Sequence, residues 1–272
     1  MPASLDEIVA ATRRRVAETK PAADLRQLER QAENHVPRGF QRALESGNLH
    51  GIAVIAELKR ASPSRGLIRA DFDSESLAKE LEGAGAAALS VLTDAEFFQG
   101  SLENLRRASA STKLPCLRKD FIVDEFQLLE ARANGADAVL LIVAVLSQAE
   151  LRRLSGRARE HDLDVLCEVH DEEELERAVD AGCNLIGVNS RDLRTFQVDL
   201  ETASRLADLI PKNALRVAES GIHSGADIAR LRAAGYQAFL IGESLMKANS
   251  PGKALQALLA EAERESHALI RK

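Results

Sequence analysis

Short apolar runs rich in β-branched residues alternate along the chain with longer segments in which apolar residues recur at helical spacing. The runs are short for helices and are typical of strands buried on both faces, as in a parallel sheet. Eight of them follow one another, at residues 52–58, 87–92, 114–117, 138–143, 165–169, 185–188, 215–218 and 238–241.

Amphipathic segments between these runs predict helices at residues 76–83, 125–134, 148–160, 172–181, 200–209 and 224–234. Glycines such as Gly135 and Gly235 follow several segments, where a helix end favours a left-handed residue. Units of strand and helix at intervals of roughly 20–35 residues predict an α/β fold. Eight units favour a closed (β/α)8 TIM barrel, and the first strand lacks the glycine-rich fingerprint of a dinucleotide-binding sheet.

The segment before the first strand, residues 1–48, predicts an N-terminal helical extension that is interrupted near Pro37 and Gly39. Barrels of this kind need about 200–250 residues. We therefore expect the 272 residues to form a single domain over 1–272, with the extension included.

Composition adds expectations about location and partners. Hydrophobic residues make up 45% of the chain, but its apolar runs are shorter than the roughly 18 residues of a membrane span. The N-terminus lacks the apolar core of a secretory signal, which predicts a cytoplasmic protein. A net charge of -6 with interspersed signs favours neither nucleic acid nor a membrane surface as a partner. No helix shows a heptad, so a monomer is expected.

The three cysteines, Cys116, Cys167 and Cys183, are odd in number and lie in or beside apolar runs. We interpret all three as buried small hydrophobic residues without a redox or metal role.

Polar and charged side chains interrupt the apolar pattern at the ends of five predicted strands, where a barrel places its reacting groups. They are Glu57 and Lys59, Lys119, Glu168, Asn189 with Arg191, and Glu219. Glu57 and Lys59 are two residues apart, so both face the barrel interior. A structural ion pair would add little stability there once desolvation is counted, which favours a catalytic role. Lysine and carboxylate brought together in a partly dehydrated pocket are suited to acid–base chemistry.

Two loops after the last strands, Glu219-Ser220-Gly221 and Gly242-Glu243-Ser244, predict a phosphate site built from backbone amides. The first loop, residues 61–66, is polar and basic, as a substrate-covering loop would be. Scarce aromatic residues, Phe98 and Phe121, lie just past two strand ends and suggest a slot for a flat ring. His170 shares a face with Glu168. No metal-ligand spacing is found, so we expect no metal and no cofactor, while a Schiff base through Lys59 or Lys119 remains open.

The ordered set of motifs closely resembles indole-3-glycerol-phosphate synthases over essentially the whole chain. The motifs are Ile55-Ala56-Glu57-Leu58-Lys59-Arg60-Ala61-Ser62-Pro63-Ser64, Leu117-Arg118-Lys119-Asp120-Phe121-Ile122, Leu140-Leu141-Ile142-Val143, Glu168-Val169-His170, Ile186-Gly187-Val188-Asn189-Ser190-Arg191, Ala218-Glu219-Ser220-Gly221-Ile222 and Ile241-Gly242-Glu243-Ser244-Leu245-Met246. The resemblance implies a small phosphorylated substrate, 1-(2-carboxyphenylamino)-1-deoxyribulose 5-phosphate. Ring closure, decarboxylation and dehydration of this substrate would be a step of tryptophan biosynthesis.

The resemblance also implies roles for individual residues. Lys119 would donate a proton during ring closure, Glu168 and Lys59 would share acid and base roles in dehydration, and Glu57 would orient the lysines. Asn189, Arg191 and Glu219 would bind polar groups of the substrate. The phosphate would lie on Ser220, Gly221, Gly242 and Glu243, the ring against Pro63, Phe98, Phe121 and Leu140, and Ser62 would help close the lid. Some relatives cover the ring with an aromatic residue from the N-terminal segment, where this chain offers Ile8 or Leu5.

Two other functions are alternatives for a barrel of this kind. Phosphoribosylanthranilate isomerase, a neighbouring barrel enzyme, would be expected to use a cysteine and an aspartate where this chain has Glu57 and Lys59. A catalytically inactive barrel that binds a ligand is the other alternative, and the retention of every candidate acid and base in one mouth argues against it.

Overall fold

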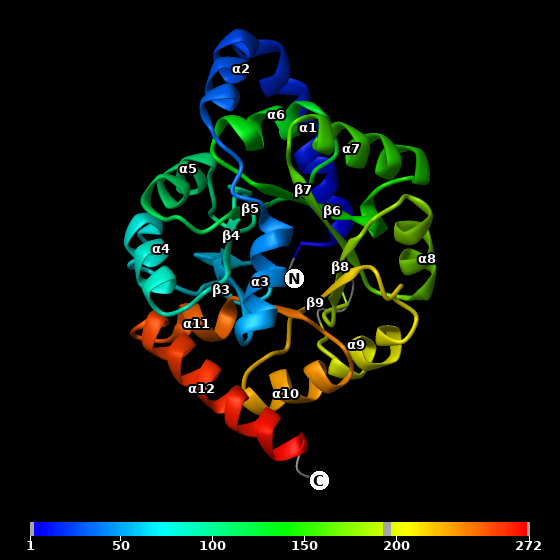
Figure 1. The fold of residues 1–272 in the computed structure, drawn as a ribbon. Helices are drawn as coiled ribbons and strands as arrows, with labels where there is room; N and C mark the ends of the chain where they lie inside the picture. Colours follow the sequence, from blue (N-terminus) through cyan, green and yellow to red (C-terminus); the bar gives the residue numbers. More distant parts are fainter. Residues whose placement is uncertain (1–2, 193–196, 271–272) are drawn as a thin grey trace.

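The computed structural model describes residues 3–192 and 197–270, which form a ring of helices around a barrel of strands (Figure 1). Within these residues, eight parallel strands close the barrel in the order β1-β10-β9-β8-β7-β6-β5-β4. They are β1 (Ala53–Leu58), β4 (Ala88–Leu92), β5 (Cys116–Lys119), β6 (Ala138–Ile142), β7 (Asp164–Val169), β8 (Leu185–Asn189), β9 (Leu215–Glu219) and β10 (Ala238–Ile241). The prediction of a (β/α)8 barrel is confirmed.

Helices return the chain along the outside of the barrel. They are α4 (Ser74–Gly83), α5 (Leu102–Ser111), α6 (Phe126–Ala133), α7 (Gln148–Glu160), α8 (Glu172–Asp180), α9 (Leu200–Ala207), α10 (Gly225–Ala233), α11 (Glu243–Lys247) and α12 (Pro251–Ile270). α5, α11 and α12 lie outside the set predicted from the sequence. The glycines that end several helices have positive φ, 83° at Gly135 and 98° at Gly235, as their spacing predicts.

The side chains of each strand alternate between two hydrophobic clusters. In β1, Ala53 and Ile55 belong to a cluster inside the barrel, whereas Val54 and Leu58 pack outward with the helices. Glu57 therefore points inward at the carboxyl end of its strand, where side chains of the neighbouring strands meet it. The same alternation puts the last inward residue of several strands at one mouth of the barrel.

Three N-terminal helices, α1 (Leu5–Ala22), α2 (Leu25–Asn34) and α3 (Phe40–His50), precede the barrel. α3 lies across the barrel centre in Figure 1, and its Phe40 and Leu44 are fully buried in the inner cluster. The backbone N–H of Gln41 donates to Asp164, the first residue of β7 (2.9 Å). α3 therefore closes the barrel at the amino ends of the strands. α1 lies at the opposite mouth, where the carboxyl ends of the strands meet.

The extension is also tied to the barrel by a buried carboxylate, that of Asp137. It accepts hydrogen bonds from the backbone N–H of Arg38 (2.8 Å), from the Arg38 guanidinium Nε (2.9 Å) and from the backbone N–H of Cys116 (2.8 Å). The guanidinium beside it and His35 lower the pKa of Asp137, although burial alone would raise it. We call this cluster of Arg38, His35 and Asp137 the lower clasp.

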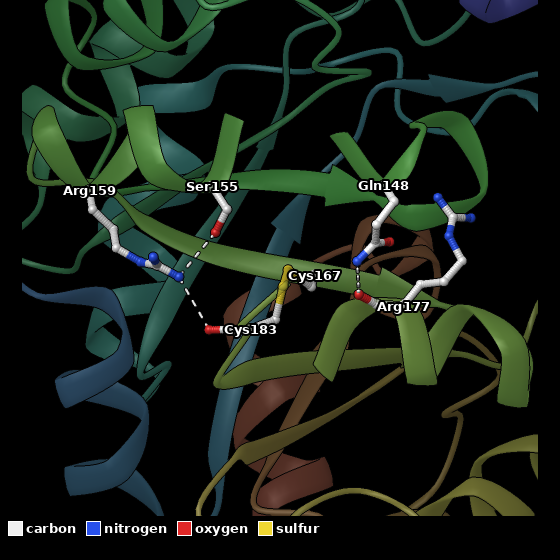
Figure 2. Close-up of a disulfide and its surroundings, with 7 residues drawn as sticks. Gln148, Ser155, Arg159, Cys167, Arg177 and Cys183 are labelled. Carbon is white, nitrogen blue, oxygen red and sulfur yellow. Dashed lines mark hydrogen bonds between the residues drawn. A yellow bond between two sulfur atoms is a disulfide. The ribbon is translucent and has the colours of Figure 1, made fainter. Parts of the chain in front are cut away.

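The interpretation of the cysteines was wrong for two of the three. Cys167 of β7 and Cys183, which lies just before β8, form a disulfide with a Cα–Cα distance of 6.4 Å (Figure 2). Arg159 of α7 donates to the carbonyl of Gly182 (3.2 Å) and so holds the loop that carries Cys183. A sequence pattern does not reveal that these two residues approach across neighbouring parallel strands. Cys116 is a free, buried thiol, and burial raises its pKa to about 12.

None of the helices in the described part of the chain is long and apolar enough to cross a membrane.

Candidate active site

One pocket at the carboxyl ends of the strands contains all the residues predicted for catalysis and for the phosphate and ring sites, except Ile8 and Leu5, the candidates to cover the ring. The residues are Glu57, Lys59, Ser62, Pro63, Phe98, Lys119, Phe121, Leu140, Glu168, Asn189, Arg191, Glu219, Ser220, Gly221, Gly242 and Glu243. They come from all eight barrel strands or the loops that follow them, which are far apart in the sequence.

Lys119 is the centre of the charged cluster. Its Nζ lies 2.6 Å from Glu168 Oε2 and 3.0 Å from Glu219 Oε2, so β5, β7 and β9 each contribute one charge. Burial disfavours the charged lysine, but the carboxylates of Glu168, Glu219 and Glu57 outweigh it and raise the pKa of Lys119 above its usual value. Lys119 is therefore an ammonium group that carries a proton at neutral pH.

The pKa values of the two carboxyl groups that contact Lys119 are shifted in opposite directions. Burial favours the neutral form of both, but Lys119 and His170 lower the pKa of Glu168 below its usual value. Burial, together with the charge of Glu168, raises the pKa of Glu219 to about 7. Glu219 Oε1 is buried without a hydrogen-bond partner among the described residues, as suits a protonated carboxyl group. Of the two carboxyl groups on Lys119, Glu168 therefore carries the negative charge and Glu219 is the one that holds a proton near neutral pH.

A second ion pair lies in the same pocket. Lys59 Nζ is 2.7 Å from Glu57 Oε1, and both side chains are largely buried. The predicted inward orientation of these two residues is confirmed. Gly242 packs directly against this carboxylate, since a Cβ at that position would lie 2.6 Å from Glu57 Oε1.

Polar side chains from β8 and the loop after it complete the mouth. Asn189 Nδ2 donates to Glu168 Oε1 (3.1 Å), and the backbone N–H of Arg191 donates to Asn189 Oδ1 (3.0 Å). The guanidinium of Arg191 lies 3.5 Å from Glu243 Oε2, and that of Arg65 lies 3.2 Å from Glu243 Oε1. The end of the pocket near β10 therefore carries more positive than negative groups.

The two loops predicted to bind phosphate meet at this end. Ser220 and Gly221 both have left-handed backbones, with φ of 66° and 77°. Such a turn points successive backbone N–H groups to one side, which forms a concavity that attracts anions. Gly242 is the residue before α11, so its neighbours Glu243 and Ser244 begin that helix.

The opposite end of the pocket is apolar. The rings of Phe98 and Phe121 are 6.3 Å apart and tilted by 39°, and Leu140 and Pro63 line the same space. Ile8 of α1 packs in the inner cluster with Phe121 and Leu140, and Leu5 packs beside it. Neither Ile8 nor Leu5 lines the pocket itself.

Sequence reasoning missed a carboxylate cluster at the edge of the pocket. Asp94 and Asp120, both buried and both pocket-lining, face Arg15 of α1 at 3.1 Å and 3.2 Å. Asp94 Oδ1 accepts hydrogen bonds from the backbone N–H groups of Phe97 (2.7 Å) and Phe98 (3.3 Å). The position of Asp94, two residues past the second strand, was the available signal. Arg15 lies in the N-terminal extension, and nothing in the sequence indicated that it would contact these carboxylates.

No group of three acidic, histidine or cysteine side chains that could hold a metal ion is found within residues 3–192 and 197–270. The ion-paired lysines and carboxylates of the pocket are suited to proton transfer near an anionic, partly aromatic ligand.

Comparison with known proteins agrees with this description. The family model described as indole-3-glycerol phosphate synthase matches residues 5–258. A protein of that name from Koribacter versatilis (strain Ellin345) is 61% identical over 259 residues, which are 95% of this chain and 100% of the relative. Another from Desulfotalea psychrophila (strain LSv54 / DSM 12343) is 51% identical and covers 82% of this chain and 85% of its own.

Solved structures show likeness in the fold alone. A mandelate oxidase variant superimposes with a TM-score of 0.60 at 20% identity, over 80% of this chain and 74% of the other. Thiamine phosphate pyrophosphorylase from Pyrococcus furiosus gives a TM-score of 0.59 at 19% identity, over 81% and 98%.

Proposed function

We propose roles for the pocket residues from the premise that this chain belongs to the indole-3-glycerol phosphate synthase family. It is an enzyme of tryptophan biosynthesis, a decarboxylating lyase. It converts 1-(2-carboxyphenylamino)-1-deoxy-D-ribulose 5-phosphate to indole-3-glycerol phosphate, carbon dioxide and water. The reaction joins a ring carbon to the ribulose carbonyl carbon, releases the ring carboxylate and then eliminates the hydroxyl group.

Lys119 is the proton donor for ring closure in this proposal. Attack of the ring carbon on the carbonyl leaves an alkoxide, which needs a proton as the charge develops. The Lys119 ammonium carries that proton and is held between Glu168 and Glu219. When carbon dioxide then leaves, its bonding electrons return to the ring and restore its aromaticity.

Dehydration needs an acid for the departing hydroxyl group and a base for the proton on the neighbouring carbon. We assign the base to Glu168, whose pKa is held low by Lys119 and His170 despite burial. We assign the acid to Lys59. Glu57 Oε1 lies 2.7 Å from Lys59 Nζ and orients its ammonium group. The hydroxyl group leaves as water, and the electrons of the broken C–H bond form the double bond of the pyrrole ring.

Binding divides along the pocket. We place the phosphate at the left-handed turn of Ser220 and Gly221 and at the backbone of Gly242 and Glu243, where Arg65 and Arg191 add positive charge. The aromatic ring fits between Phe98, Phe121, Leu140 and Pro63. Asn189 and Arg191 bind polar groups of the substrate, and Glu219 binds a hydroxyl group or the ring nitrogen. Ser62 lies in the loop formed by β2 (Ala61–Ser62) and β3 (Gly66–Leu67) and helps to cover the bound substrate.

The observation that carries the proposal is Lys119 of β5, held between the carboxyl groups of Glu168 on β7 and Glu219 on β9. Its test is fluorescence-monitored turnover of the substrate by wild-type protein, Lys119→Ala and Glu168→Gln. Loss of a positioned acid or base lowers kcat by roughly 10²–10⁴-fold. Lys212→Ala, which removes an exposed lysine, is the matched control and should keep wild-type turnover.

The outcomes separate the alternatives. If the two variants bind substrate but lose turnover, the acid and base roles stand. Turnover by Lys119→Ala within a few-fold of wild type would overturn the role of that residue. Wild-type protein that binds the compound without converting it would instead support the inactive barrel.

We also propose that the enzyme acts in the cytoplasm as a monomer without a nucleic-acid partner. A phosphate ester is anionic and does not cross a membrane unaided, so a pathway that passes it between enzymes is confined to their compartment. The net charge of -6 supports the expectation about nucleic acid. Sedimentation of the purified protein at micromolar concentration tests the oligomeric state, since a dimer would have twice the mass.

A further inference from the structure

A row of three ionisable side chains leads from the pocket into the wall behind it. His170 follows the end of β7, and Glu174 lies in the first turn of α8. The imidazole Nδ1 is 2.9 Å from Glu174 Oε2, and its Nε2 is 3.4 Å from Glu168 Oε1. Only Glu168 of the three lines the pocket. His170 and Glu174 thus approach the reaction only through the carboxylate in front of them.

The imidazole is not needed to hold the loop between β7 and α8. The backbone N–H of His170 already donates to Glu174 Oε2 (2.8 Å), and the backbone N–H of Glu174 donates to Asp171 Oδ1 (2.9 Å). A smaller neutral side chain at position 170 would leave both hydrogen bonds in place. Burying a positive charge here is costly unless carboxylates face it, and the two that do are Glu168 and Glu174.

Nε2 points at Glu168 without completing a hydrogen bond. It is buried and has no hydrogen-bond partner among the described residues, and Asn189 Nδ2 donates to the same oxygen, Glu168 Oε1 (3.1 Å). The contact is therefore an ion pair, which acts on the charge of Glu168. Although burial opposes it, the facing carboxylates of Glu168 and Glu174 raise the pKa of His170 to about 10, so the imidazolium persists through neutral pH.

We propose that His170 is a positioning residue for Glu168: an imidazolium, braced by Glu174, that keeps the Glu168 carboxylate ionised and oriented as the base. The charged groups that face Glu168 come from several elements. Lys119 of β5 and His170 favour its ionised form, and Glu219 of β9 opposes it. Two other strands contribute uncharged groups beside Glu168: β8 contributes the neutral amide of Asn189, and β6 contributes the apolar side chains of Leu140 and Ile142. Glu57 of β1 lies on the far side of Lys119.

The inference rests on the proposed role of Glu168 and predicts a shift in the pH dependence of turnover. Removal of the imidazolium removes one of the two cations that favour ionised Glu168, so the pKa of Glu168 rises. The base is then protonated at a higher pH than in the wild type. His170→Gln should move the acidic limb of the kcat profile upward by about one pH unit, with kcat on that limb about tenfold lower. KM should stay within about twofold, because His170 does not line the pocket.

The experiment compares pH profiles of kcat and KM for wild type, His170→Gln, Glu174→Gln and Glu172→Gln. Glu174→Gln leaves the imidazole in place but removes the negative charge that faces its Nδ1. We therefore expect a smaller shift of the kcat profile in the same direction. It decides the question if His170→Gln fails to fold. Glu172→Gln removes an exposed carboxylate from the same turn of α8 and should match wild type.

Profiles of both His170→Gln and Glu174→Gln that superimpose on wild type would overturn the proposal. An equal shift for Glu172→Gln would also overturn it, since the effect would then belong to the general charge of α8. If Glu168→Gln retains turnover, the proposed role of Glu168 fails. If Glu168→Gln is inactive while the His170 profile is unchanged, only the present inference fails.

Discussion

Two glycines occupy positions where any larger residue would collide with a carboxylate of the pocket. A Cβ on Gly187 would lie 2.1 Å from Glu219 Oε1, and one on Gly242 would lie 2.6 Å from Glu57 Oε1. Neither glycine has a left-handed backbone. At these two positions glycine is required by the close approach of a side chain from a neighbouring strand and not by a turn.

Glu219 is the residue whose protonation should make stability depend on pH. Its pKa of about 7 in the folded protein lies above the unfolded value near 4.3. The stabilisation of the protonated form is therefore present below the unfolded pKa and is lost as pH rises through 7. Glu219→Gln stays neutral, so its unfolding free energy relative to wild type should increase by about 1–3 kcal/mol between about pH 5 and pH 8.

Urea unfolding of both proteins at several pH values measures this difference. Glu265→Gln, which changes an exposed carboxylate on α12, is the control and should follow wild type at every pH. Parallel curves for Glu219→Gln and wild type would contradict the raised pKa.

Residues of the pocket were predictable from the sequence when they stand at strand ends. Lys119 and Glu168 break an apolar run where a core residue is expected, and that contrast alone identifies them. Arg15 and Asp94 gave no such contrast, because an arginine on a helix and an aspartate in a loop are ordinary. Their significance depends on α1 lying over the mouth, which no local pattern encodes.

At the scale of elements, α1 closes the pocket through one arginine. The Arg15 guanidinium bridges Asp94 and Asp120, and Asp94 in turn holds the backbone before the Phe98 ring. Burial and the neighbouring charge of Asp120 raise the pKa of Asp94, and the cation of Arg15 on α1 opposes this shift only in part. The helix and the ring slot are therefore connected by a continuous set of hydrogen bonds.

Substitution of Arg15 should weaken substrate binding in the ring slot. Arg15→Met leaves Asp94 buried without its cation, so we expect a several-fold higher KM and a smaller change in kcat. Stability should fall by about 1–3 kcal/mol, the usual cost of an unpaired buried polar group. Steady-state kinetics and thermal unfolding measure the two effects. Arg14→Met, on the exposed side of the same helix, should behave as wild type; a KM for Arg15→Met equal to that of this control would contradict the link.

The predicted strands and most helices agree with the structure to within about two residues at each end. The first missed helix, α5, carries several small and polar residues, LENLRRASAS, which weaken its apolar period. The cysteine interpretation failed for a different reason. Strand pairing brings Cys167 and Cys183 together, and pairing is a property of the closed sheet.

For the whole molecule, we propose that the extension and the barrel form one folding unit over residues 1–272. α3 fills one end of the barrel and the lower clasp fixes the chain that leads into it. Tyr236 is the only tyrosine and the chain has no tryptophan, so tyrosine fluorescence reports on the barrel, where the Tyr236 hydroxyl donates to the carbonyl of Ala203 (2.8 Å). Far-UV circular dichroism reports on all helices, including α1, α2 and α3.

The two signals should therefore change at the same urea concentration. Arg38→Met, which breaks the lower clasp, should lower both midpoints together. A loss of circular dichroism amplitude before any change in tyrosine fluorescence would mean that the extension unfolds separately, and the single-domain proposal would fail.

The disulfide closes a covalent ring around the end of β7 and the helix that follows it. Glu168, His170, Glu174 and the whole of α8 lie between Cys167 and Cys183 in the chain, so the base and its supporting residues belong to a covalently closed ring. A protease that cuts α8 would leave two fragments still joined through sulfur. Such a nicked enzyme would run as one band on a gel without reductant and as two bands with it.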